Sequence, residues 1–166
     1  MLPLLFLIAL PATFAFPTDN EPSFLDKIKP RETVCVRGKL RCGNQPLLPT
    51  TYLKLYDEDT GNIDDPMAAG TAASNGEFSL CGSGRDWAWA GSIDPVLKIY
   101  TRCKYRGPVE NCFRKIRFEL PQHFVGKTYV FAEDIDLTSV FDEDRERCFD
   151  ENEETEFLLI TESPST

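Results

Sequence analysis

The chain of 166 residues is predicted to be all-β, an antiparallel β-sandwich of seven to eight strands. Three observations favour this fold class. Short segments in which apolar and polar residues alternate recur roughly every ten residues along the chain. Turn-forming pairs such as Asn75-Gly76 stand between these segments. No long segment has the period of an amphipathic helix, so a single helical turn is expected at most, in 121–125 or 141–148.

Each strand is expected from the alternation within its own segment. In chain order the segments are 33–41, 51–56, 68–71, 77–81, 95–103, 112–120 and 127–137, with 156–161 as a candidate eighth. Apolar side chains at every second position mark the face that turns to the core. These side chains are Val34, Val36, Leu40, Leu53, Leu55, Phe78, Leu80, Leu97, Ile99, Ile116, Phe118 and Leu120. Turn residues end the first segment at Gly43–Pro46, and Pro121 ends the sixth.

The first fifteen residues have the composition of a secretory signal peptide. Residues 1–15 are apolar and uncharged, and Thr13-Phe14-Ala15 approximates a small-x-small cleavage signal. We expect residues 16–32 to be a flexible segment, 33–161 to be one sandwich domain, and 162–166 to be a tail. Within the domain, 138–156 is expected to be an acidic, loosely structured connection. The chain is therefore predicted to be secreted and extracellular, without a transmembrane segment.

Charge is distributed unevenly along the chain, which has a formal net charge of −9. Residues 98–117 carry a net +6, whereas residues 133–156 carry a net −10. This asymmetry predicts either a dipolar surface or an acidic tail that screens a basic face. Export and overall acidity both argue against nucleic acid as a partner.

Four segments, 36–59, 70–83, 94–103 and 112–121, together resemble the nematode transthyretin-like family. The matching motifs are Gly38-x-Leu40-x-Cys42-Gly43 before Pro46, the block Lys54–Asp57, the turn Asn75–Phe78, and Cys103 and Cys112 around one loop. The resemblance implies a secreted, prealbumin-like sandwich of two four-stranded sheets, and it implies no reaction.

Six cysteines allow fifteen disulfide connectivities, and the sequence alone does not choose among them. In the arrangement that the resemblance implies, Cys35 and Cys81 lie on neighbouring strands and point outward, so we expect them to pair. Cys103 and Cys112 flank one loop and point inward, which predicts a second bridge. Cys42 then pairs with Cys148. A zinc site is not expected, because the chain has no CxxC spacing and one histidine.

No catalytic group, metal site or cofactor is predicted. Relatives of transthyretin include a 5-hydroxyisourate hydrolase that uses several histidines and a C-terminal Tyr-Arg-Gly-Ser, whereas this chain has only His123 and a mid-chain Tyr105-Arg106-Gly107. His123 is expected to be exposed near a strand end. The acidic residues of 57–65 fail the spacing of a calcium loop.

If the second, fifth and sixth strands adjoin, their outward side chains form one basic and aromatic face. The candidate ligand-binding residues there are Tyr52, Lys54, Tyr56, Lys98, Tyr100, Arg102, Phe113, Lys115 and Arg117. Such a face suits an anionic partner, although any solvent-facing strand needs polar and aromatic residues.

The resemblance suggests what this partner is, because some family members are secreted bridging factors that recognise phosphatidylserine. Anionic lipid is therefore the leading partner, and an extracellular protein receptor is the other. The alternatives are a carrier of a small hydrophobic ligand in an oligomeric channel, or a hydroxyisourate-hydrolase-like enzyme. We expect a monomer or weak dimer.

Overall fold

The computed structural model describes residues 30–45, 47, 51–59, 64–86, 91–107 and 111–149. The expected signal peptide, almost all of the N-terminal segment, the candidate strand 156–161 and the tail 162–166 lie outside these residues. Predictions about those parts remain predictions. No α-helix occurs in the described residues, which confirms the all-β class.

Nine strands and one 3-10 turn make up the described fold. The strands are β1 Glu32–Arg41, β2 Tyr52–Asp57, β3 Asp65–Thr71, β4 Glu77–Gly84, β5 Pro95–Thr101, β6 Cys112–Glu119, β7 Thr128–Val130, β8 Ile135–Asp136 and β9 Asp144–Cys148. The turn, η2, spans Gln122–Phe124, where the sequence predicted a helical turn.

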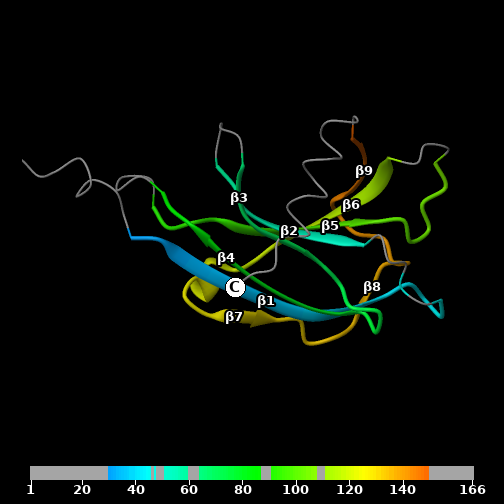
Figure 1. Ribbon diagram of the computed structural model, residues 1–166, viewed down its shortest axis with the longest axis horizontal. Helices are drawn as coiled ribbons and strands as arrows, with labels where there is room; N and C mark the ends of the chain where they lie inside the picture. Colours follow the sequence, from blue (N-terminus) through cyan, green and yellow to red (C-terminus); the bar gives the residue numbers. More distant parts are fainter. Residues whose placement is uncertain are drawn as a thin grey trace, which may run out of the picture.

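The strands form two sheets that lie one above the other as layers (Figure 1). One sheet has the order β4-β1-β7, with β8 also paired to β1, and the other has the order β3-β2-β5-β6-β9. Most neighbouring strands run antiparallel, whereas β7 and β8 run parallel to β1. The sandwich is therefore built from a four-stranded and a five-stranded sheet, one strand more than the two four-stranded sheets that the resemblance implied.

The core lies between the sheets and uses the predicted inward faces. Val34, Leu55, Leu97, Ile99 and Ile116 are fully buried there. The predicted Asn-Gly turn forms between β3 and β4. Gly76 has a φ of +86°, and a Cβ on it would lie 2.0 Å from the Leu40 carbonyl oxygen, so only glycine fits.

Two segments differ from the sequence prediction. Residues 127–137, expected as one strand, form β7 and β8, because the chain bends away from β1 at 132–133 before pairing with it again. Within 138–156, the structure pairs Asp144–Cys148 with β6 as strand β9, where the sequence suggested a loose connection or a helical turn. This segment is ordered because it forms backbone hydrogen bonds with β6, whose edge would otherwise be unpaired.

Three disulfides staple the sandwich, and one of the three predicted pairs is confirmed. Cys35 and Cys81 are directly opposite on β1 and β4 and are bonded. The predicted Cys103–Cys112 and Cys42–Cys148 pairs are wrong, because the structure joins Cys42 to Cys103 and Cys112 to Cys148.

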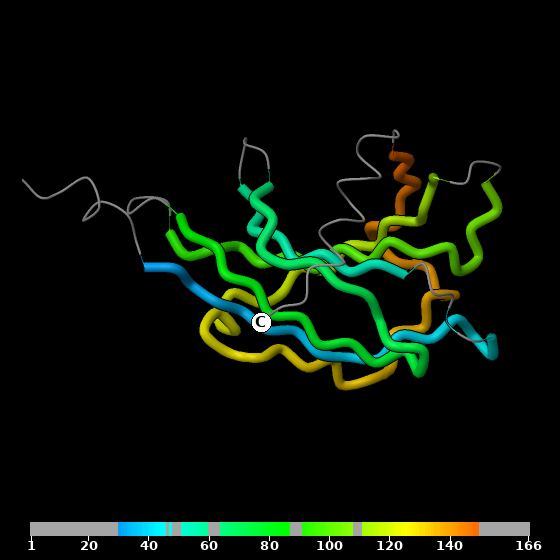
Figure 2. Tube along the Cα trace, in the orientation of Figure 1, coloured from blue at the N-terminus to red at the C-terminus, as the bar shows by residue number. Residues whose placement is uncertain are grey.

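The physical reason for these two corrections is the position of each cysteine in space. Cys42 follows β1 and Cys103 follows β5, and Figure 2 shows that the chain reaches the same end of the sandwich after both strands. The bond between these cysteines therefore ties one sheet to the other. Cys112 and Cys148 are directly opposite on β6 and β9, so their bond holds β9 on its sheet.

Candidate binding face

Strands β2, β5, β6 and β9 lie side by side and turn alternate side chains away from the core. We call this surface of the five-stranded sheet the outer face. One row across it is Tyr52, Tyr100, Lys115 and Arg145, and the next row is Lys54, Lys98 and Arg117. The structure thus brings the predicted candidates of β2, β5 and β6 together, with Tyr56 at the end of β2 and Arg102 just beyond β5.

The outer face is more covered than the sequence suggested. Lys54 is 8% exposed and Lys98 is 7% exposed, and both Tyr100 and Phe113 are buried. Tyr52, Tyr56, Arg102, Lys115 and Arg117 are half-buried. The face is therefore a small second core with charged groups around it, and not a flat open sheet.

An aromatic cluster forms the centre of the outer face. Phe149, which follows β9, contacts Tyr100 with ring centroids 5.6 Å apart and Phe113 at 5.9 Å. Tyr52 packs edge-on against Phe113 at 5.8 Å. Burial, followed by the field of Tyr56, raises the pKa of Tyr100, so its hydroxyl stays protonated.

Cations lie over these rings. The Lys98 Nζ is 4.3 Å from the centroid of the Tyr56 ring, and the Arg102 guanidinium carbon is 4.9 Å from that of Phe113. The Arg147 guanidinium carbon lies 5.4 Å from the Phe149 centroid. Each such contact stabilises a cation in a position where water is partly excluded, by about 0.5–2 kcal/mol.

Some of the predicted cations already have carboxylate partners. Lys98 pairs with Asp64, and Arg117 pairs with Glu58, Glu119 and Glu143. Two of these partners, Asp64 and Glu58, come from the acidic connection between β2 and β3. The acidic segment after β8 supplies Glu143, as the screening interpretation of the charge asymmetry predicted.

Lys115 differs from Lys98 and Arg117. No described carboxylate lies within ion-pair distance of its ammonium group. Partial burial lowers the pKa of Lys115, the charges of Lys98, Arg145 and Arg147 lower it further, and the one opposing charge is that of Asp64. Positive charge is therefore in excess around Lys115.

Arg145, Arg147 and Phe149 are parts of the outer face that sequence reasoning missed. The acidic composition of their surroundings hid a period of two, in which Arg145, Arg147 and Phe149 alternate with acids and a cysteine. That alternation was the signal from which a strand could have been predicted.

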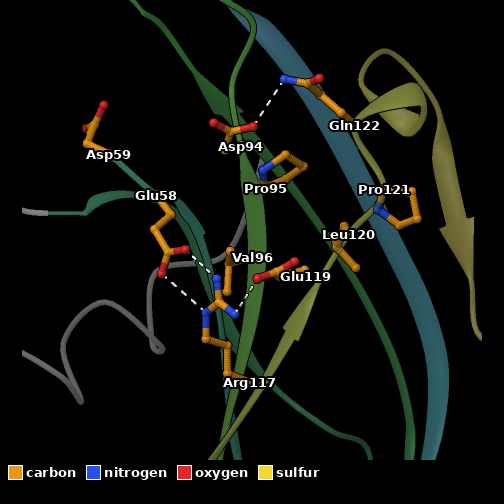
Figure 3. A pocket seen from close by; sticks show the side chains of 10 residues that line it. All are labelled: Glu58, Asp59, Asp94, Pro95, Val96, Arg117, Glu119, Leu120, Pro121 and Gln122. Carbon is orange, nitrogen blue, oxygen red and sulfur yellow. Dashed lines mark hydrogen bonds and ion pairs between the residues drawn. The ribbon is translucent and has the colours of Figure 1, made fainter. Parts of the chain in front are cut away.

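A cavity of about 590 Å³ lies beside the outer face (Figure 3). Arg117 projects into it toward Glu58 and Glu119, and Gln122 donates a hydrogen bond of 3.1 Å to Asp94. The apolar part of its lining consists of Pro95, Val96, Leu120 and Pro121. Because Arg117 is held by three carboxylates, the cavity presents an ion-pair network and offers no uncommitted cation to an anion.

The residues considered for catalysis or metal binding lie apart from one another in the structure, and each has a structural contact of its own. His123 is exposed on η2, as predicted, and its ring contacts Phe124. Tyr105 donates a hydrogen bond of 2.9 Å to Glu146, so this loop packs on β9. In the described residues the one group with metal-ligand spacing is Cys112, Glu146 and Cys148, and its cysteines are disulfide-bonded.

The fold and its bridges define a class of protein, a disulfide-stapled antiparallel β-sandwich domain. The model of the transthyretin-like family matches residues 37–121, and the chain belongs to that family. In Caenorhabditis elegans, transthyretin-like protein 33 is 36% identical over 119 residues, covering 68% of this chain and 79% of the relative.

Two other relatives from Caenorhabditis elegans are similar over shorter stretches. Transthyretin-like protein 46 is 34% identical over 107 residues, covering 64% of this chain and 57% of the relative. Transthyretin-like protein 5 is 37% identical over 93 residues, covering 55% of this chain and 63% of the relative. The family and the three disulfides are consistent with an extracellular protein. Among the described residues there is no helix with the length and apolarity needed to cross a bilayer.

Proposed function

We propose that the protein is a secreted, non-enzymatic binding module that attaches to an anionic lipid surface through the outer face of its five-stranded sheet. The observation that carries the proposal is the excess of positive charge around Lys115, which has no described carboxylate partner. Anionic headgroups supply the charge that this region lacks.

The rigidity of the outer face supports the same function. Its rings are fixed by mutual contacts, and the Cys112–Cys148 bond holds β9 beside β6. Cations on a rigid support lose little conformational freedom on binding, so more of the electrostatic attraction is retained as affinity. The half-buried aromatic residues add contact area at the level of the headgroups.

Cosedimentation with vesicles tests this proposal. The mature, oxidised protein should bind vesicles that contain phosphatidylserine or phosphatidylglycerol and should not bind vesicles of pure phosphatidylcholine. The bound protein should dissociate as the salt concentration is raised. Lys115→Glu should weaken binding by at least about five-fold, since one cation near an anionic surface contributes about 1 kcal/mol. Lys39→Glu on β1, in the other sheet, is the matched control.

Absence of binding to every anionic vesicle at low salt would remove the lipid proposal. Capture of one extracellular protein, with no vesicle binding, would favour a protein receptor. A stable tetramer by light scattering would favour the carrier, and turnover of 5-hydroxyisourate above background would favour the enzyme.

A further inference from the structure

The cavity beside the outer face has more acids than its one cation can pair with. Four carboxylates and one guanidinium line it, a formal charge of −3, and these groups are Glu58, Asp59, Asp94, Glu119 and Arg117. Glu58 and Glu119 pair with Arg117, whereas Asp59 and Asp94 have no ion-pair partner among the described residues. Two carboxylates of the cavity are therefore available to a cation from outside.

The fields of these two carboxylates overlap. Burial is the main reason that the pKa of Asp57 is raised, and the charges of Asp86, Asp59 and Asp94 raise it further. Asp59 and Asp94 thus act on one small volume at the end of β2. A cation in the cavity would be attracted by several acids at once.

The size and spacing of the cavity suit an organic cation better than a metal ion. In the part of the chain that the structure describes, no three acidic side chains bring their oxygens within 4.8 Å of one another, as a compact calcium shell requires. The volume of about 590 Å³ is within the range of about 300–1,000 Å³ that is typical of sites for organic ligands.

The walls of the cavity favour an arginine side chain. Figure 3 shows Glu58 and Asp59 on one side and Leu120 and Pro121 on the other, so a bound cation would contact both acids and an apolar wall. The methylene groups of an arginine suit the apolar wall, and its flat, weakly hydrated guanidinium can bind two carboxylates through separate N–H groups.

Arg117 already shows this chemistry inside the cavity. Its Nε and Nη2 bind Glu58, while its Nη1 binds Glu119. The carboxylates that remain, Asp59 and Asp94, can bind a second guanidinium in the same way.

A second hollow, of about 440 Å³, adjoins the cavity. Arg117 and Glu119 line both hollows, and we call the two together the acidic groove. Val140, which is 96% exposed, and the half-buried Phe141 give the second hollow an apolar lining. A protein segment can place one side chain in each hollow, whereas a small molecule fills only one.

We propose that the acidic groove is a docking site for a protein segment that inserts an arginine side chain beside Asp59 and Asp94 and places an apolar side chain beside Val140. The inference goes beyond the proposed function. Glu119 is four residues from Lys115 along β6, or about 13 Å, so the groove and the proposed lipid-binding region lie at different ends of the sheet.

Titration of the full mature chain with blocked tripeptides, followed by heteronuclear NMR, tests the inference without vesicles. Val-Arg-Val should shift the amide signals of Asp59, Asp94 and Gln122, and its affinity should fall as salt is raised. Val-Lys-Val should bind at least about three-fold more weakly, and Val-Gln-Val should leave these signals unchanged.

Asp59→Asn together with Asp94→Asn should weaken the binding of Val-Arg-Val at least about five-fold, because both available charges are removed. Asp59→Asn alone should weaken it about two-fold, which keeps the test decisive if the double variant does not fold. The matched control Glu133→Gln, Asp134→Asn removes two exposed acids between β7 and β8 and should leave the affinity unchanged.

Three results would overturn the inference. One is the absence of any shift with Val-Arg-Val at low salt, and another is equal binding of Val-Gln-Val, which would mean that the cation contributes nothing. The third is unchanged affinity in the folded variants of Asp59 and Asp94. Vesicle binding, which these variants should retain, judges the proposed function separately.

Two further comparisons identify the source of the cation. Blocked arginine should bind at least about five-fold more weakly than Val-Arg-Val, because it leaves the second hollow empty. Equal affinity would overturn the assignment to a protein segment. Outside the described residues the chain has two basic side chains, Lys27 and Lys29. Lys27→Gln with Lys29→Gln should leave the affinity unchanged, and tighter binding would mean that the chain's own N-terminal segment is the occupant, which would overturn the assignment to a partner.

Discussion

Strands β1 and β9 both carry cations on the outside of a sheet, and each is stapled to its neighbour by a disulfide between directly opposed residues. They differ in what stands across from the cations. On β1, Arg37 donates to Ser79 at 3.2 Å, Lys39 is opposite Glu77, and Arg41 pairs with Asp136. On β9, Arg145 is opposite another cation, Lys115.

The difference teaches that register, and not composition, decides which charged side chains face one another across a pair of strands. β1 lies inside its sheet and meets complementary groups on both sides. β9 is the last strand of its sheet and turns its acids to one side only. β9 therefore places Arg145 directly opposite Lys115 on the outer face, whereas its acids contact Tyr105 and Arg114.

The largest effect is expected when the disulfide of β9 and that of β1 are removed in separate variants. In the chain-entropy model, bridges with sequence separations of 36 and 46 residues each contribute about 4 kcal/mol. Cys112→Ala with Cys148→Ala, and Cys35→Ala with Cys81→Ala, should therefore lower the free energy of unfolding similarly in chemical denaturation. Only the first pair should also reduce vesicle binding, because it frees β9. Equal loss of binding in both would contradict a special role for β9.

The next largest effect is expected from the substitution of Arg114. Its guanidinium pairs with Asp144 and donates to the carbonyl oxygens of Cys103, at 2.9 Å, and Leu137, at 2.7 Å. Arg114→Ala leaves these half-buried groups unpaired, so the free energy of unfolding should fall by about 3 kcal/mol. Arg37→Ala, which removes one exposed bond to a hydroxyl, should cost under about 0.5 kcal/mol. Denaturant titration compares the two, and a similar small loss in both would show that Arg114 does not anchor β9.

Phe149→Ala tests the aromatic support of β9. Phe149 is buried and contacts Tyr100 and Phe113, so its truncation should destabilise the fold by about 2 kcal/mol. Hydrogen exchange should show faster opening of β9 than of β1. Unchanged protection of β9 would mean that the disulfide alone fixes it.

Asp57, on β2, is an acid that lies near other acids, as Arg145 lies near other cations on β9. Burial, together with Asp86, Asp59 and Asp94, raises its pKa to about 6, although the backbone N–H of Asp94 donates to it. The folded state therefore holds this proton more tightly than the unfolded state, so stability from this group declines as pH rises from about 4 to about 6.

Asp57→Asn removes that decline and keeps an acceptor for the Asp94 N–H. The free energy of unfolding of the variant should exceed that of the wild-type protein by about 1 kcal/mol or more at pH 7, and by almost nothing at pH 4. Thermal unfolding at the two pH values measures both differences. A gain of equal size at both pH values would contradict the titration of Asp57.

The alternation of apolar residues was sufficient to predict β1 to β6, since Leu53, Leu97 and Ile116 are buried where a period of two places them. The confirmed bridge, Cys35–Cys81, depended only on neighbouring strands. The Cys42–Cys103 bridge depends on which ends of two stacked sheets coincide, and nothing in the local pattern specifies this.

The candidate site was predictable only in part. The parity of Tyr52, Lys98 and Lys115 placed them on one face, but parity does not say what covers that face. Glu58, Asp64 and Phe149 reach it from segments distant in sequence. β9 was missed because its charged residues have low strand propensity, and its order depends on the edge of β6 and a disulfide.

The five-stranded sheet ends in two strands that discourage a further strand from joining it. At one border, β3 carries Pro66, and its pairing with β2 shifts register beside Leu55 and Tyr56. At the other border, β9 lies where β6 would otherwise offer unpaired amides to a second molecule. β9 itself is short and carries four charged residues, which discourages a further strand from pairing with its own free edge.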